Sequence, residues 1–117
     1  MHSLPDIVKA IALNNKINES RDLAEAVQRS MVKRLGQKNR TLRDLGVKQA
    51  PFVVLIGAGM PSVLAEISFV TNKQDGALLK TQGYRQQIAQ ALMDAVVGYQ
   101  QSLKRMNGMA AKKATSQ

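Results

Sequence analysis

The chain contains no cysteine and no tryptophan, and aromatic residues make up only 3% of it. Without cysteine, neither disulfide bonds nor thiolate metal ligands are available. Since 44% of the residues are hydrophobic, a core can form, but it must be aliphatic. The apolar runs are far shorter than the roughly 20 residues that span a bilayer, so we expect no membrane span. A chain of 117 residues makes one domain at most.

Histidine and acidic residues are also scarce. The only histidine, His2, stands beside Met1 in no ligand spacing, so we interpret it as a surface residue rather than a metal ligand. The chain therefore cannot assemble a histidine-rich zinc site by itself. Residues 1–15 do not resemble a signal peptide, because Pro5 and Asp6 stand where a basic segment and an apolar core should be.

Positive charge is in excess, with 17 lysines and arginines against 8 acidic residues and a net charge of +9. The basic residues cluster at 33–48 and in the tail at 104–113. No aromatic residues interleave with them, and no helix-turn-helix or RNA-binding motif accompanies them. We therefore favour solvated charge, or attraction to an anionic polymer, and expect no nucleic-acid partner. A basic nucleic-acid-binding protein is the less favoured alternative, and it predicts salt-sensitive binding.

The first third of the chain predicts two helices. Ser3 is a suitable N-cap, with Pro5 and Asp6 in the first turn. We expect this helix to end at residues 14–15, which are both asparagine. A second helix is predicted from about residue 18 to a C-cap at Gly36. Its apolar positions recur every four residues, at Leu23, Val27, Met31 and Leu35.

Two apolar segments in the middle of the chain predict strands. Residues 52–56, with the sequence FVVLI, are typical of a strand covered on both faces, and residues 62–69 predict a second strand. After a loop, Asp75 is expected to cap a short helical turn. A last helix, packed against a sheet, is predicted from its apolar stripe: Tyr84, Ile88, Leu92, Val96, Tyr99 and Leu103.

The expected fold class is α/β, with the element order α-α-β-β-α. Two strands do not make a stable sheet by themselves, because an isolated two-stranded unit is marginal in water. We therefore interpret the chain as the C-terminal portion of a mostly parallel sheet flanked by helices, with the earlier strands absent. The sequence physics alone suggests a fragment.

The glycines at positions 57 and 59 could indicate a phosphate-binding loop. Such loops lead into a helix whose N-terminus binds the anion. Here Pro61 and a predicted strand follow instead. A tight turn is the favoured interpretation.

Glu66 is the one carboxylate between Asp44 and Asp75, and it lies inside the most apolar stretch of the chain. We expect it to be buried. Burying a carboxylate costs roughly several kcal/mol of desolvation free energy unless a charged or hydrogen-bonding partner offsets it. Two interpretations stay open: an acid with a chemical task, such as a general base, or a structural carboxylate paired with Arg43 or Arg85. Its expected polar neighbours are Ser62, Ser68 and Asn72.

Residues 43–72 resemble the C-terminal part of the zinc-dependent N-acetylmuramoyl-L-alanine amidases of bacterial cell-wall turnover. The most diagnostic stretch is MPSVLAE at residues 60–66, followed by Phe69 and Asn72. SRDLA at 20–24 is similar to a family helix, and APFVVL at 50–55 is similar to the family's penultimate strand. The resemblance covers residues 3–104, which we assign to the C-terminal part of a catalytic domain. Residues 105–117 are expected to form a disordered basic tail.

This resemblance implies hydrolysis of the amide between N-acetylmuramic acid and L-alanine in peptidoglycan or a muropeptide. In such enzymes two histidines and a glutamate hold a zinc ion that activates water, and a second glutamate, matching Glu66 here, acts as general base. Nothing in this chain matches the zinc ligands, and Ser68 stands where members commonly have glycine. The resemblance thus assigns zinc to the complete domain and makes the missing N-terminal half a candidate partner.

Two further expectations follow from the resemblance. The family acts in the periplasm or cell envelope, although no residue here directs the chain there. We expect the chain to have no amidase activity alone. The alternative is a non-catalytic remnant or binding module of the same fold.

Overall fold

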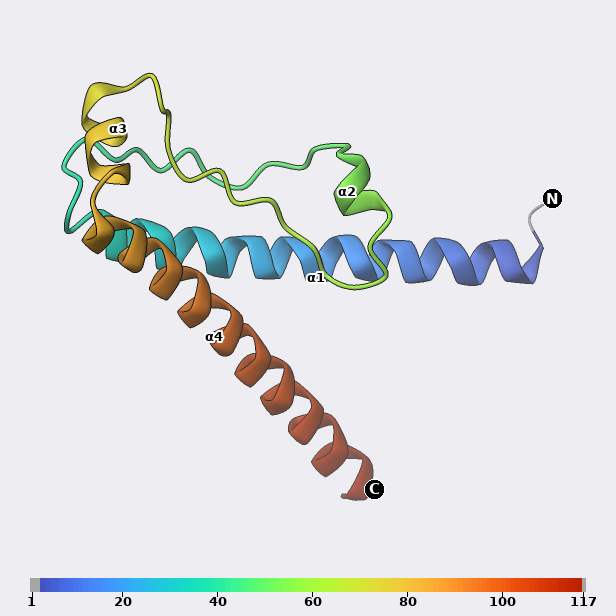
Figure 1. Ribbon diagram of the computed structural model, residues 1–117. Helices are drawn as coiled ribbons and strands as arrows, with labels where there is room; N and C mark the ends of the chain where they lie inside the picture. Colours follow the sequence, from blue (N-terminus) through green and yellow to red (C-terminus); the bar gives the residue numbers. More distant parts are fainter. Residues whose placement is uncertain (1–2, 117) are drawn as a thin grey trace.

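Two long helices dominate the computed structural model, which describes residues 3–116 (Figure 1). Helix α1 spans Leu4–Leu35 and helix α4 spans Gln82–Thr115. Between them lie two short helices, α2 (Val53–Ile56) and α3 (Lys73–Leu79). Figure 1 shows α4 beginning beside the C-terminal end of α1 and diverging from it, while the chain between α1 and α3 runs along α1.

The predicted start and end of the N-terminal helical region are confirmed. The Ser3 side chain accepts a hydrogen bond from the Asp6 backbone, and the Asp6 side chain accepts one from the Ser3 backbone. Gly36 closes the helix with its N–H bonded to the carbonyl of Val32. The expected break at residues 14–15 is wrong, because α1 is continuous. Asparagine inside a helix costs only roughly 0.7 kcal/mol relative to alanine, too little to end it.

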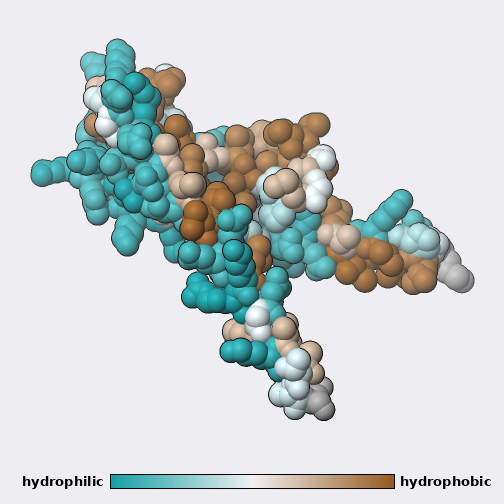
Figure 2. Space-filling model, turned by 60° about the horizontal axis from the view of Figure 1, so that its bottom comes forward, coloured by the Kyte–Doolittle hydropathy of each residue, from teal (hydrophilic) through white to brown (hydrophobic). Residues whose placement is uncertain are grey.

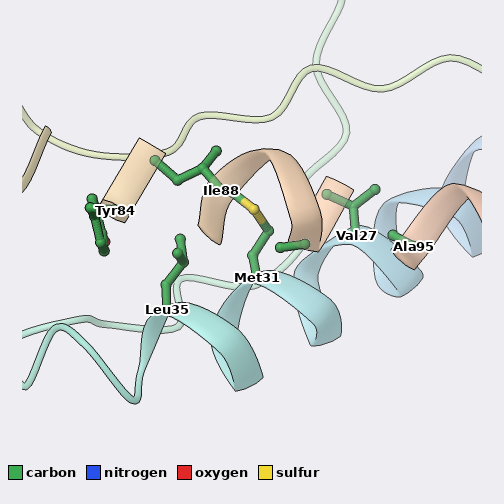
Figure 3. Close-up of a cluster of buried hydrophobic side chains, with 7 residues drawn as sticks. Val27, Met31, Leu35, Tyr84, Ile88 and Ala95 are labelled. Carbon is green, nitrogen blue, oxygen red and sulfur yellow. The ribbon is translucent and has the colours of Figure 1, made fainter. Parts of the chain in front are cut away.

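The core lies where α1 and α4 cross. Figure 3 shows side chains from α1 pointing toward side chains from α4. Most of the predicted stripe on the last helix is on the correct face, but this face packs on α1 and not on a sheet. Toward the C-terminus the stripe becomes exposed, and the Val96 side chain is 44% exposed. The buried set is Val27, Met31, Leu35, Tyr84, Ile88, Ala91 and Ala95.

The α/β prediction is wrong, because residues 3–116 contain no strand and no sheet. The FVVLI segment bonds locally instead: Ile56 N–H donates to the Phe52 carbonyl and Gly57 N–H to the Val53 carbonyl, which makes α2. Residues 58–68 make no backbone–backbone hydrogen bond within the described chain. A strand is stabilised by its ladder partners, and neither segment has one here. The order α-α-β-β-α and the portion of a parallel sheet are therefore both corrected to an all-helical arrangement.

The middle of the chain is also more exposed than its composition predicts. Val53 is 85% exposed and Val70 is 80% exposed. Figure 2 shows hydrophobic side chains gathered in a band across the molecule. The expectation that this stretch is buried is wrong for the chain by itself.

Helix α3 is capped by Asn72 rather than by Asp75. The Asn72 side-chain oxygen accepts hydrogen bonds from the backbone N–H groups of Gln74 and Asp75. Residues 105–115, expected as a tail without structure, continue α4 with every side chain exposed. The domain boundary at residue 104 stays a prediction. No helix within residues 3–116 combines the length and the apolar character of a membrane span.

Candidate functional site

Glu66 lies on the irregular segment between α2 and α3. The side chains of Val63 and Ala65 pack against the α1–α4 core, while Leu64 is 52% exposed. Packed and exposed side chains thus alternate along this segment, and Glu66, like Leu64, is exposed. The expected buried carboxylate is therefore corrected to a solvent-facing one, on a segment that the core holds from its other side.

Glu66 has no protein partner among the described residues. It makes no hydrogen bond and no ion pair there, so the pairing with Arg43 or Arg85 considered above is not formed. Arg85 instead donates to the carbonyl of Leu79 at 2.8 Å. Both carboxylate oxygens of Glu66 are thus open to an external proton donor.

The segment that leads to Glu66 is anchored to α1 by Ser20 and Lys16, whose anchoring role sequence reasoning missed. Ser62 N–H donates to the Ser20 hydroxyl oxygen at 3.0 Å, and the Ser62 hydroxyl donates to the Leu55 carbonyl at 3.2 Å. The ammonium group of Lys16 donates to the carbonyls of Leu55 and Ile56, at 2.7 and 3.1 Å. A cation at the C-terminal end of α2 is favourable for the exposed carbonyls there.

The other two expected neighbours of Glu66 have different roles. Asn72 caps α3, as described above. The Ser68 hydroxyl is buried and has no hydrogen-bond partner in the part of the chain that the structure describes. Neither side chain bonds to Glu66, so the polar company predicted from the sequence does not form a joint site.

Asn39 is the most deeply buried polar side chain near this region, at 2% exposure. Its amide donates to the Asp75 carboxylate at 2.9 Å and to the Tyr84 hydroxyl at 3.4 Å. The second Asp75 oxygen accepts from the N–H of Phe69, three residues after Glu66. Asn39 therefore links the end of α1, α3 and the start of α4. Its position in a polar loop gave no signal of burial.

A hollow of about 480 Å³ lies between α1 and α4, away from Glu66. Its lining includes Arg29, Lys33, Arg34 and Asp94, and no residue of the segment 60–70. A hydrogen bond from Gln90 and the Arg34 guanidinium lower the pKa of Asp94 below its ordinary value of 3.8. Asp94 is thus held ionised and paired, which suits a structural role.

Residues 3–116 bring together no group of three histidine, aspartate or glutamate side chains that could hold a metal ion. His2, interpreted as a surface residue, lies outside the described residues. The described residues therefore do not fit the zinc ion that the resemblance implies.

A family model described as N-acetylmuramoyl-L-alanine amidase matches residues 8–97. The amidase LytC of Bacillus subtilis is 42% identical over 80 residues, which cover 68% of this chain and 15% of LytC. The amidase AmiA of Escherichia coli is 45% identical over 58 residues, half of this chain and 20% of AmiA. The endolysin of Bacillus phage SPP1 is 30% identical over 106 residues, or 91% of this chain and 37% of that protein.

The chain thus spans well under half of the length of each of these relatives. The comparison with solved structures found no match. The family match covers most of α1, all of α2 and α3 and the first part of α4, and it includes Glu66. The chain therefore belongs to the N-acetylmuramoyl-L-alanine amidase family, which confirms the resemblance drawn from its sequence.

Proposed function

We propose that this chain contributes Glu66 as the general base of an N-acetylmuramoyl-L-alanine amidase. The observation that carries the proposal is the state of this carboxylate. It lies within the family match, on a segment anchored to α1 and the core, yet it is exposed and has no hydrogen-bond or ion-pair partner among residues 3–116. An anchored carboxylate with free oxygens is what a proton acceptor in hydrolysis requires.

The reaction is hydrolysis of the amide between the lactyl group of N-acetylmuramic acid and L-alanine. The oxygen of water bonds to the carbonyl carbon while Glu66 accepts the water proton. The C–N bond then breaks as the nitrogen receives a proton from Glu66, which leaves a carboxylic acid and the free amine of L-alanine. Since the described residues do not fit a zinc site, the role derived for this chain is limited to these proton transfers.

The exposed apolar surface supports a second part of the proposal, that the rest of an amidase catalytic domain binds here. Side chains that are ordinarily buried are exposed along the middle of the chain, and a contiguous exposed apolar surface marks an interaction site. The candidate partner is the N-terminal half of the domain. The members of this surface are Phe52, Val53, Val54, Ile56, Met60, Leu64, Phe69 and Val70.

The proposed substrate also sets the proposed location. Peptidoglycan lies in the cell envelope, so we place the activity in the periplasm or envelope. The names of LytC and AmiA as N-acetylmuramoyl-L-alanine amidases support the substrate class.

A hybrid enzyme tests the catalytic role. In it, residues 8–97 of this chain replace the matching segment of LytC, and amide hydrolysis is measured on a purified muropeptide. The hybrid with Glu66 should be active and the hybrid with Glu66→Gln should not. Glu25→Gln is the matched control and should keep the activity, because Glu25 is also an exposed glutamate but lies on α1. A Glu66→Gln hybrid as active as the Glu25→Gln hybrid and the parent would remove Glu66 from catalysis. A binding module would then be the remaining alternative.

A further inference from the structure

One end of the molecule carries most of the unbalanced positive charge. Residues 33–43 and 73–85 contain eight basic residues and one acidic residue, Asp75. These ranges hold the C-terminal end of α1, the turn after it, α3 and the start of α4, and Figure 1 shows them together at one end. We call this the basic end. Its basic residues are Lys33, Arg34, Lys38, Arg40, Arg43, Lys73, Lys80 and Arg85.

Internal pairing leaves most of this charge free. Arg34 pairs with Asp94, and Arg85 donates to the Leu79 carbonyl. Asp75 is already engaged, because its two oxygens accept from Asn39 and Phe69. The remaining six side chains are exposed and form neither an ion pair nor a side-chain hydrogen bond with residues 3–116: Lys33, Lys38, Arg40, Arg43, Lys73 and Lys80.

These six cations lie on elements that are joined to one another. Asn39 bonds to Asp75 and Tyr84, which joins the turn after α1 to α3 and to α4. Figure 2 shows hydrophilic side chains gathered over this end and the hydrophobic band beside it. A group of cations held on a joined framework, in excess over the one carboxylate among them, attracts a chain of anions.

The side chains here favour a polymer without bases. Single-stranded nucleic acid is bound by several aromatic side chains on which bases stack. The chain has four aromatic residues, and hydrogen bonds tie two of them, Tyr84 and Phe69, to this end. Tyr84 is only 3% exposed, so Phe69 is the one of these two on which a base could stack. Cations without a row of exposed aromatic side chains suit a polymer that has phosphates but no bases, such as one whose phosphates are joined by small polyols.

We propose that the basic end binds a linear polyol phosphate polymer, with successive phosphates contacting its six unpaired cations. The inference rests on the proposed function in one respect, since that function places the chain where envelope polymers are met. The contact would hold the enzyme on its insoluble substrate while Glu66, on a separate segment, stays accessible. Binding releases counterions, so affinity should fall steeply with salt.

The test measures binding of the whole chain to poly(glycerol phosphate) by isothermal titration calorimetry across a range of salt concentrations. The test variant combines Lys33→Gln, Lys38→Gln, Arg40→Gln and Lys80→Gln. The control combines Lys9→Gln, Lys104→Gln, Lys112→Gln and Lys113→Gln, which removes the same charge from exposed positions outside the basic end. Circular dichroism verifies that both variants keep the helix content of the natural chain.

We expect the test variant to bind at least about tenfold more weakly at low salt. The slope of log affinity against log salt should fall by about 3, near 0.7 for each of the four lost phosphate contacts, as for a single-stranded polyanion. The control should stay within about threefold of the natural chain. An equal loss in both variants, or no binding at low salt, overturns the proposal. Tighter binding to duplex DNA with the same number of phosphates, or to phosphatidylglycerol vesicles, overturns it as well. No step depends on hydrolysis, so failure here is distinct from failure of the catalytic role.

Discussion

The hydroxyl oxygen of Ser20 accepts a hydrogen bond from the backbone N–H of Ser62 at 3.0 Å. This bond joins the middle of α1 to the segment that leads to Glu66, across 42 positions of the sequence. Lys16, one turn earlier on α1, bonds to the carbonyls of Leu55 and Ile56 at the end of α2. Helix α1 is therefore the framework on which an otherwise irregular segment is positioned.

Replacing Ser20 by alanine should release that segment. The N–H of Ser62 loses its acceptor, so the free energy of unfolding should fall by about 1 kcal/mol. Amide hydrogen exchange at Ser62, followed by NMR, should become faster. Ser102→Ala is the matched control, because the Ser102 hydroxyl bonds within its own helix to Tyr99. Unchanged exchange at Ser62 in the Ser20 variant would contradict the anchoring role.

Asn39→Ala should destabilise the junction of α1, α3 and α4. The substitution removes the donor to Asp75 and Tyr84 and the acceptor for Thr41, and it leaves these partners unsatisfied. We expect a loss of about 2 kcal/mol in the free energy of unfolding, measured with urea. Asn107→Ala, at an exposed position of α4, should change it by less than about 0.5 kcal/mol. Similar effects of the two substitutions would refute the bridging role.

The pair of Arg34 and Asp94 should make the α1–α4 contact sensitive to acid. The pKa of Asp94 is lowered in the folded chain, so its contribution is fully present above the ordinary value of 3.8. That contribution is lost as the pH falls from 3.8 through the lower folded pKa. Asp94→Asn should therefore lower Tm at neutral pH, and the difference from the natural chain should shrink below pH 3.8. A difference in Tm that stays constant with pH would rule out this linkage.

The chain by itself should not hydrolyse a muropeptide, even with zinc added. Its exposed apolar surface is the proposed binding site for the rest of the domain, and no group of metal-ligating side chains gathers in residues 3–116. Mass spectrometry of a long incubation would detect released peptide. Clear turnover that a chelator abolishes would show that the chain is sufficient, against this expectation.

The helices were largely predictable from the sequence because their signals are local. Ser3 is the N-cap that the sequence predicts, with Asp6 in the first turn, and the repeat from Val27 to Leu35 faces the core as expected. The asparagines at 14–15 misled the prediction, since their small helix penalty is outweighed by the helical residues on both sides. Local rules thus located the ends of the helical region but divided one helix into two.

The strands were not predictable from the same rules, because a strand depends on partners that a local pattern does not contain. FVVLI has the composition of a buried strand, yet in this chain Ile56 and Gly57 bond back to Phe52 and Val53. The burial expected for Glu66 depended on that sheet and failed with it. What succeeded was the longer pattern of residues 60–72, which identified the family.

The value of kcat for the LytC hybrid carrying Glu66→Gln shows whether Glu66 is the general base. We expect a decrease of about 10²–10⁴-fold relative to the hybrid with Glu66, because a general base contributes that much to the chemical step. The Glu25→Gln hybrid should keep its kcat. Glu66→Gln should leave Tm unchanged, because the Glu66 side chain is exposed and pairs with no other side chain within residues 3–116. A Glu66→Gln hybrid as active as its parent would contradict the assignment of Glu66 as the base.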